Sequence, residues 1–415
     1  MKYDTIIIGG GLSGLTAGIR LAEKGKKVAI VSLGQSALHF SSGSFGLLGQ
    51  LGDKEVSSPL EAMKELDGNH PYRRIGLEQV AALAKDVKPM FAAAGMSLRG
   101  DETVNSLRLT PFGICKPSWL TFSDFITFDK NESSKIKKCI IVNFKGYLDF
   151  YPDFIADGLT RMGIESVPAT VSVDVVERLR KSSSEMRAAS IARLLRGDVI
   201  DALAAEINRV ADAADADTVL MPAVVGFDSE KPLAQLRGKV LKPLYCVATT
   251  PMSVCGTRAQ LLLRRRFEQL GGTYLLGDNV VSGKFASDGH LKSVMTANLG
   301  DDEMEADTFI LATGGLFSRG IVADPHKVYE PVFGLDVKAP EDREQWYERD
   351  FFVRQPYMSF GVSVDADFHP LRSGKPVANL YAIGSVVGGY DALKEGSGAG
   401  VALLTALYVA NMIKR

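Results

Sequence analysis

The stretch DTIIIGGGLSG, residues 4–14, decides the fold of this chain. Its apolar first half predicts a buried strand, and its second half fits G-x-G-x-x-G with Gly9, Gly11 and Gly14 in the glycine positions. In this pattern the first glycine permits a tight turn, the second a close approach of a pyrophosphate, and the third a close contact between helix and strand. The stretch therefore predicts a dinucleotide-binding turn, to which a plain glycine turn without a ligand is the alternative.

The residues after this turn complete a βαβ unit. Leu15, Ile19 and Ala22 have helical spacing, and Gly25 stands where the C-cap of that helix is expected. Residues 27–32, KVAIVS, have the composition and length of a second strand. The start of the helix would offer its N–H groups and the positive end of its dipole to a phosphate.

An acidic residue is missing at the end of the second strand. In dinucleotide-binding units this residue binds a ribose 2′-hydroxyl, but the chain has Ser32 there, which offers one weak hydrogen bond. The missing acid argues against a standard adenosine dinucleotide. A second glycine-rich turn is also missing, because the middle βα unit that begins at residue 138 has only Gly146 in its turn. NAD(P)H is therefore not expected as a substrate.

Two later strands end in glycine turns that resemble those of flavoproteins. The stretch ILATGG resembles a turn in which the backbone passes close to a dinucleotide, with Thr313 and Gly314 as candidate contacts. The stretch NLYAIGSVVGG resembles the last cofactor strand of such proteins, with Gly384 and Ser385 as candidates. An acidic residue usually holds a ribityl hydroxyl at the position of Ser385, so a second acid is missing.

The stretch EGSGAG, residues 395–400, opens the last predicted helix, which continues to the end of the chain. Gly398 and Gly400 would let the N-terminus of this helix approach a flavin ring, where the helix dipole would stabilise negative charge on the reduced flavin. Each of these turns has an ordinary turn as its alternative. Their order and spacing along the chain favour a flavin-binding domain.

Length and composition limit the remaining classes. With 415 residues, 46% of them hydrophobic and 23% charged, the chain is long enough for two or three ordinary globular domains. The formal net charge of -1 provides no global positive field, so we expect no nucleic acid as a partner. We expect an α/β architecture, with a Rossmann-type, glutathione-reductase-like flavin-binding domain of residues 1–60 and 256–415. An inserted mixed α/β domain for substrate or partner would comprise residues 61–255.

The cysteines and the apolar stretches point to no metal site and no membrane span. The four cysteines are scattered, without a C-x-x-C pair or a histidine cluster, so we expect neither zinc nor an iron–sulfur cluster within the chain. The N-terminus enters a strand at once and lacks the features of a signal peptide. The longest apolar stretch, residues 401–413, is shorter than the ~20 residues of a membrane-spanning helix.

Five stretches together resemble the family of the B subunit of anaerobic glycerol-3-phosphate dehydrogenase, namely MKYDTIIIGGGLSGLTAG, GQSALHFSSGSFGLL, ILATGG, EPVFGLDV and LYAIGSVVGGYDA. The resemblance covers essentially the whole chain, and GQSALHFSSGS is its most specific part. It implies a flavoprotein that works with the catalytic A subunit to oxidise sn-glycerol 3-phosphate to dihydroxyacetone phosphate. It also implies a membrane-bound iron–sulfur C subunit that passes electrons to quinone and on to fumarate or nitrate. The chain would then be peripheral, at the cytoplasmic face of the inner membrane.

The resemblance also bears on the cofactor. The family is assigned FMN, which fits the missing acid at Ser32, whereas the complete pyrophosphate turn fits FAD. We therefore expect FMN and keep FAD as the alternative.

Alcohol oxidation by a flavin needs a base for the hydroxyl proton and a cation for the substrate phosphate. His39 is the preferred base, because it precedes a serine-rich loop that runs along the flavin in similar proteins; a structural histidine is the alternative. His70, which precedes a proline, reads as a loop residue. Arg258 is the preferred cation, at the start of the helix that returns to the cofactor domain, although a surface salt bridge is the commoner role of an arginine.

The serine-rich loop itself supplies further candidates. Ser41, Ser42 and Gly43 are expected to contact the flavin, with ordinary hydrogen bonds within a loop as the alternative.

Four other functions remain open. A non-catalytic flavin subunit would only relay electrons from the A subunit. A stand-alone enzyme of the fumarate-reductase type would keep the acids that are missing at Ser32 and Ser385. A flavoprotein that modifies RNA would need a basic domain, and a scaffold that has lost its flavin would be colourless.

Overall fold

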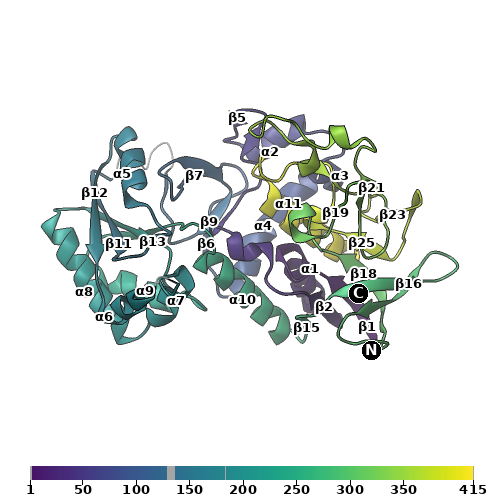
Figure 1. Cartoon of the computed structure of the whole chain (residues 1–415), viewed down its shortest axis with the longest axis horizontal. Helices are drawn as coiled ribbons and strands as arrows, with labels where there is room; N and C mark the ends of the chain where they lie inside the picture. The colour runs from purple at the N-terminus through teal and green to yellow at the C-terminus, as the bar shows by residue number, and fades with distance from the viewer. Residues whose placement is uncertain (1, 129–135, 183, 415) are drawn as a thin grey trace. The chain divides into compact units, whose positions relative to one another are not determined.

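The computed structural model describes residues 2–128, 136–182 and 184–414, which form two compact units (Figure 1). Unit 1 comprises Met1–Ala37, Gly46–Met90 and Leu263–Arg415, and unit 2 comprises Leu38–Phe45 and Phe91–Leu262. The boundaries expected at residues 60 and 256 stay predictions; residues 38–45 and 256–262 lie in unit 2, and residues 61–90 lie in unit 1. The functions assigned to the two expected domains stay predictions.

Unit 1 is built on a mixed sheet whose central strands are parallel. The order across the sheet is β15-β2-β1-β18-β17-β16, and β25 also pairs with β18. The pairings of β17 with its neighbours are antiparallel, and the others are parallel. The strands are β1 (Lys2–Ile8), β2 (Val28–Ser32), β15 (Thr273–Leu276), β16 (Val280–Phe285), β17 (Leu291–Thr296), β18 (Met304–Leu311) and β25 (Leu380–Ala382). The expected α/β class and its βαβ start are confirmed, and the glutathione-reductase-like detail stays a prediction.

Two helices cover the centre of this sheet. α1 (Leu12–Glu23) follows the first glycine turn, and α11 (Gly398–Met412) packs against it. Most residues of α11 are buried, which explains why it is apolar on all sides rather than amphipathic. The other helices that lie in unit 1 or begin there are α2 (Pro59–Ala62), α3 (Pro71–Ile75) and α4 (Leu77–Ala93).

Unit 2 contains a parallel sheet of order β12-β11-β13-β14 and two small antiparallel sheets of order β10-β7-β8 and β3-β9-β6. Helices α5 and α8 pack against β11 and β12 (Figure 1). The strands of the parallel sheet are β11 (Lys138–Phe144), β12 (Glu165–Val171), β13 (Thr218–Pro222) and β14 (Leu244–Val247). Those of the small sheets are β3 (Ser44–Phe45), β6 (Leu98–Arg99), β7 (Ser106–Leu109), β8 (Cys115–Ser118), β9 (Leu120–Phe122) and β10 (Thr127–Phe128). The helices are α5 (Pro152–Arg161), α6 (Asp174–Glu177), α7 (Ala188–Leu194), α8 (Asp198–Ala213), α9 (Lys231–Lys239) and α10 (Val254–Gln269), which ends in unit 1.

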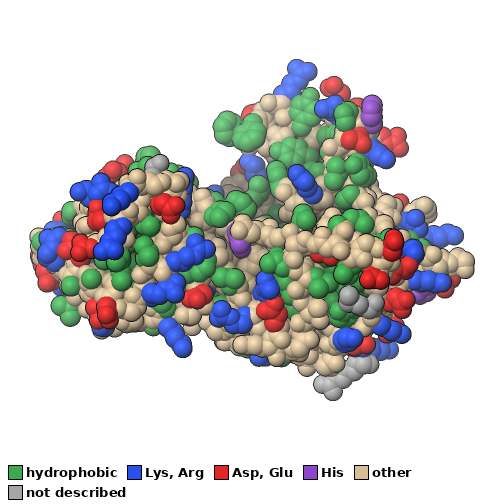
Figure 2. Space-filling model, turned by 60° about the horizontal axis from the view of Figure 1, so that its bottom comes forward, with side chains coloured by type: hydrophobic (Ala, Val, Ile, Leu, Met, Phe, Trp, Pro, Cys, Tyr) green, Lys and Arg blue, Asp and Glu red, His purple; other side chains and the backbone are tan. Residues whose placement is uncertain are grey.

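Charged side chains of both signs are spread over the surface. On the face drawn in Figure 2, basic and acidic side chains are intermixed. Within the described ranges, no helix is both long enough and apolar enough to cross a bilayer.

Candidate functional site

Three glycine turns of unit 1 follow the ends of neighbouring parallel strands. Ile8 of β1 is level with Leu311 of β18, and Leu311 is level with Ala382 of β25. The turns at residues 9–14 and 313–315, and the one that follows Ala382, therefore leave the sheet at the same edge. In open parallel sheets, ligands bind outside the carboxyl ends of the strands. The structure thus brings together the three glycine turns that the sequence singled out.

Two of the glycines in the first turn are required by the turn itself. Gly9 has a φ of +117°, and a Cβ there would lie 2.2 Å from the carbonyl oxygen of Ala312. A Cβ on Gly14 would lie 1.9 Å from the carbonyl oxygen of Gly9. A side chain at either position would therefore force the backbone apart.

Gly11 is different, because no contact in the described part of the protein requires a glycine there. Its φ of -81° and ψ of -168° are open to any residue. Among the described residues, the nearest atom to a Cβ on Gly11 would be Cβ of Ser36, at 3.6 Å. The bare backbone at Gly11 therefore faces free space, as a turn that receives a pyrophosphate should.

The second and third turns add polar groups at the same edge. Oγ1 of Thr313 is buried and has no hydrogen-bond partner within the described part of the chain. A buried hydroxyl is normally satisfied, so a ligand or water is its expected partner. Ser385 is exposed, and a Cβ on Gly314 would lie 3.7 Å from its Oγ. Gly384 has a φ of +69°, and its N–H donates to Oγ1 of Thr405 in α11 at 2.9 Å.

Ser32 lies under the first turn. Its side chain is 4% exposed, and its Oγ donates to the carbonyl oxygen of Gly34 at 3.3 Å. A Cβ on Gly10 would lie 2.5 Å from this Oγ and 2.0 Å from Oη of Tyr274. The hydroxyl of Ser32 therefore already donates a hydrogen bond within the protein. Its proposed contact with a ribose stays a prediction.

The start of α11 is free of a side-chain cap. Ser397 is in the N-cap position, but its Oγ donates to Oε2 of Glu395 at 3.0 Å rather than accepting from the helix. The first N–H groups of a helix have no intrahelical partner. The expected helix after EGSGAG is confirmed, and it starts at Gly398. Gly400 is required by packing, since a Cβ there would lie 2.2 Å from Oη of Tyr72.

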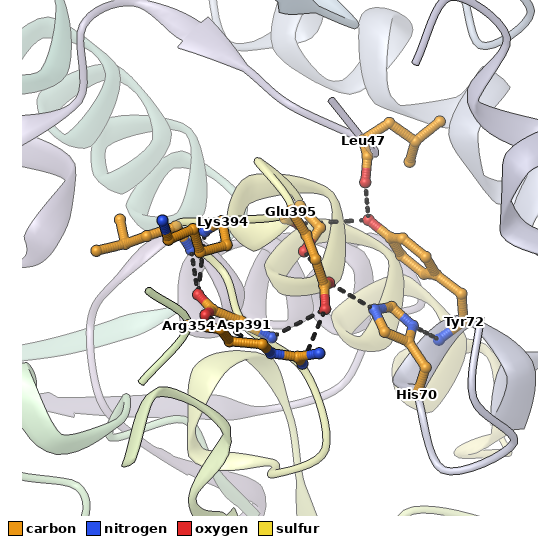
Figure 3. Close-up of polar contacts among 9 residues, drawn as sticks. Leu47, His70, Tyr72, Arg354, Asp391, Lys394 and Glu395 are labelled. Carbon is orange, nitrogen blue, oxygen red and sulfur yellow. Dashed lines mark hydrogen bonds and ion pairs between the residues drawn. The ribbon is translucent and has the colours of Figure 1, made fainter. Parts of the chain in front are cut away.

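His70 lies in the loop before α3, as expected, and it is also a buried member of the polar network in Figure 3. The residue is 2% exposed, and its Nδ1 accepts from the N–H of Tyr72 at 3.1 Å, which caps α3. Since Nδ1 is an acceptor, the proton is on Nε2, which donates to Oε2 of Glu395 at 3.1 Å. This bond joins segments that are 325 residues apart in the sequence. It fixes the residue that immediately precedes the glycines of α11.

Glu395 is held from several sides. Burial raises the pKa of its carboxyl, but the hydrogen bond from His70, with those from the N–H of Asp391 and the hydroxyl of Ser397, outweighs burial and holds the pKa below its ordinary value. Arg354 approaches Oε1 of Glu395 at 3.7 Å and Oδ2 of Asp391 at 4.0 Å (Figure 3). The carbonyl oxygen of Glu395 accepts from two backbone N–H groups of residues 49–50. The segment before α11 is therefore rigidly attached to unit 1.

We expect His70→Asn to lower the free energy of unfolding by about 1.5–3 kcal/mol, the worth of a hydrogen bond to a charged group. Asparagine can accept at the place of Nδ1, so it keeps the cap of α3, but it has no donor at the place of Nε2. His70→Gln is the converse variant, because its side chain places a donor near the position of Nε2 but is a poor cap for α3. Urea unfolding of both, alone and combined with Glu395→Gln, measures the coupling of the pair. Strictly additive effects of His70→Asn and Glu395→Gln would contradict the bond.

The other residues that were predicted to contact the flavin or the substrate lie in unit 2. His39 is buried, with no hydrogen-bond partner for Nδ1 in the described chain, and burial lowers its pKa. Oγ of Ser42 lies 2.9 Å from Oγ of Ser44, and the N–H of Gly43 donates to Oγ of Ser41 at 3.3 Å. The serines therefore show the hydrogen bonds within a loop that were the alternative, and their contacts to a flavin stay predictions.

Arg258 is fully buried in unit 2. Its Nη1 donates to the carbonyl oxygens of Val225 at 3.3 Å and Gly226 at 3.1 Å, and its guanidinium lies 4.7 Å from the ring centre of Phe122. Nε and Nη2 are buried with no hydrogen-bond partner among the described residues. The contacts of Nη1 indicate that Arg258 stabilises the loop at 225–226. Its expected contact with a substrate phosphate stays a prediction.

Comparisons with known proteins bear on the family of the chain and on its cofactor. The FAD binding domain family matches residues 4–401. A protein of Yersinia pseudotuberculosis, named as the B subunit of anaerobic glycerol-3-phosphate dehydrogenase, is 41% identical over 419 residues, which cover 100% of this chain and 98% of the relative. The protein of the same name from Pectobacterium atrosepticum is 43% identical over 418 residues, covering 100% of this chain and 99% of the relative.

Among solved structures, the 3-ketosteroid delta1-dehydrogenase of Sterolibacterium denitrificans aligns with a TM-score of 0.46 and 12% identity, covering 99% of each chain. The family match supports a flavin cofactor, and the preference for FMN is not confirmed. The observations at Gly11 and Thr313 fit such a group, because they combine free space beside the first turn with a buried hydroxyl that has no partner in the described part of the chain. At the start of α11, the N–H of Gly400 already donates to the carbonyl oxygen of Gly46 at 2.8 Å.

Proposed function

The chain belongs to the family of the B subunit of anaerobic glycerol-3-phosphate dehydrogenase, and we propose that it is the flavoprotein subunit of such an enzyme. The enzyme would oxidise sn-glycerol 3-phosphate to dihydroxyacetone phosphate. The observation that carries this proposal is the similarity over the full chain, supported by the three glycine turns at one edge of the sheet.

We propose FAD as the flavin rather than FMN. FAD contains a pyrophosphate, and the bare backbone at Gly11 leaves space for one. The match to the FAD binding domain over residues 4–401 supports the same choice. The absence of an acid at Ser32 then means that the adenosine ribose is held by other groups.

A bound flavin would supply the two-electron acceptor that alcohol oxidation requires. The chain's own residues would hold it and prepare the substrate. The N–H groups at the start of α11 would stabilise negative charge, and Oγ1 of Thr313 would donate to an acceptor on the cofactor. His39 stays our proposed base, because burial lowers its pKa and so favours the neutral imidazole, which can accept a proton.

The relatives are named as one subunit of an enzyme, which supports a complex of several chains. We propose two partners. One is the catalytic A subunit, and the other is the membrane-bound iron–sulfur C subunit, through which electrons pass to quinone. The chain would then be peripheral, at the cytoplasmic face of the inner membrane. In this arrangement any metal cluster belongs to a partner.

Anaerobic addition of glycerol 3-phosphate tests the proposal. We expect the flavin absorbance of the assembled complex to bleach within the mixing time, and unphosphorylated glycerol to have no such effect. Bleaching of the isolated chain would assign substrate oxidation to it, whereas bleaching only in the presence of the catalytic partner would assign it the electron-relay role. A complex whose flavin absorbance does not respond would contradict the proposed function.

A further inference from the structure

Unit 2 contains a basic cluster that the proposed function does not use. The small sheet β10-β7-β8 (β7 is labelled in Figure 1) places Thr127, Arg108 and Lys116 side by side, because Arg108 is in register with Thr127 on one strand and with Lys116 on the other. Residues directly opposite in antiparallel strands have side chains on the same face. Arg99 joins the group, since its Nη2 donates to Oγ1 of Thr127. The basic cluster consists of these four residues.

The positive charges of the basic cluster have no carboxylate partner in the part of the chain that the structure describes. Nε and Nη1 of Arg108, and Nε of Arg99, are buried with no hydrogen-bond partner in the described ranges. Arg99, Arg108 and Lys116 form no ion pair with a carboxylate of those ranges. Burial lowers the pKa of Arg108 to about 10, which leaves the guanidinium charged at neutral pH.

Without a bound anion, this arrangement of positive charges is energetically unfavourable. Like charges directly opposite in a sheet repel, and a buried charged donor without an acceptor pays its full desolvation penalty. Two other arginines of unit 2 have carboxylate acceptors. Arg209 binds Glu206 with two hydrogen bonds of 2.8 Å, and Arg180 binds Glu177. Within the described ranges, the basic cluster therefore has no anion to balance its charge.

We propose that the basic cluster binds a phosphate ester, and, if the proposed function holds, that this is the phosphate of glycerol 3-phosphate. Three cations and one hydroxyl suit a group of charge near −2 with three terminal oxygens. The planar fork of an arginine matches two of these oxygens at once, which a single lysine cannot do. The buried Nε and Nη1 of Arg108 favour a small soluble ester over the headgroup of a lipid in a bilayer surface.

Thermal unfolding and calorimetry with inorganic phosphate test this proposal on the full chain. We expect phosphate to raise the melting temperature of the native protein, because a ligand of the folded state stabilises it. Arg108→Gln should weaken phosphate binding at least tenfold and abolish the shift. Arg237→Gln is the matched control, since Arg237 is an exposed arginine of α9 in the same unit, and it should behave like the native protein. Equal phosphate affinities of the Arg108 and Arg237 variants would overturn the proposal.

Further experiments identify the source of the phosphate and provide a second variant in case the first does not fold. Lys116→Gln changes an exposed side chain and should weaken binding severalfold even if Arg108→Gln does not fold. In the assembled enzyme, Arg108→Lys should raise KM for glycerol 3-phosphate with kcat nearly unchanged. Binding to phosphatidylglycerol vesicles that depends on Arg108, without binding of soluble phosphate, would overturn the assignment. Arg108-dependent binding in a complex whose flavin is not bleached would instead reject the proposed function and leave the anion site standing.

Discussion

The variant Gly14→Ala should yield little folded protein and no bound flavin. A Cβ at this position would lie 1.9 Å from the carbonyl oxygen of Gly9, and the obstacle is backbone whose own N–H donates to the carbonyl oxygen of Val31 in β2 at 2.9 Å. The helix α1 would have to move away from β1, and overpacking costs about 1–3 kcal/mol, and occasionally more where backbone has to shift. A loss of that size is a large part of the 5–15 kcal/mol by which domains are typically stable.

Urea unfolding and the flavin absorbance of the purified protein measure this effect. Gly34→Ala is the matched control, because Gly34 lies in the same unit and no atom lies within 4 Å of a Cβ placed there. The control should retain both stability and colour. A Gly14→Ala protein as stable as the Gly34 variant would show that the close contact of α1 with the first turn is wrong.

The variant Gly11→Ala should fold normally and still bind flavin at least tenfold more weakly, a difference of about 1.4 kcal/mol. The backbone at Gly11 is compatible with alanine, and the nearest atom to the new methyl group would be Cβ of Ser36 at 3.6 Å. The protein itself therefore tolerates the change. A pyrophosphate that approaches this backbone would meet the methyl group instead.

Gly11→Val should strengthen the effect, because the larger side chain fills more of the free space. Fluorescence titration of the flavin-free protein gives the affinity, and urea unfolding gives the stability. If Gly11→Ala and Gly11→Val both bound flavin like the native protein, the first turn would not be the cofactor site. If both variants were as unstable as Gly14→Ala, the conclusion that free space lies beside Gly11 would be wrong.

The glycine turns could be predicted from the sequence because their causes are local. A strand of Ile residues, three glycines at fixed spacing and an amphipathic run already describe a βαβ unit, and β1, α1 and β2 lie where they were expected. A break that depends on one residue is harder to predict. Residues 188–213 form two helices, α7 and α8, which are separated at Gly197, whose φ is +56°.

The polar network at α11 could not be predicted, because it depends on distant pairing. Nothing near His70 in the sequence indicates that its Nε2 donates to Glu395, 325 residues later. The proline after it suggested a loop, and the structure shows that this proline is instead the first residue of α3. Ser32 was read correctly as the end of β2, but its burial under the turn depends on Tyr274 from β15. Sequence patterns identify such positions only after the sheet order is known.

Flavin released from the native chain by heat or acid, and identified and counted by chromatography, tests the central claim most directly. The account predicts FAD, at about one molecule per chain, and a much lower content in Gly11→Ala prepared in the same way. FMN at full occupancy in both proteins, or no flavin in the native chain, would contradict a dinucleotide site at the first glycine turn.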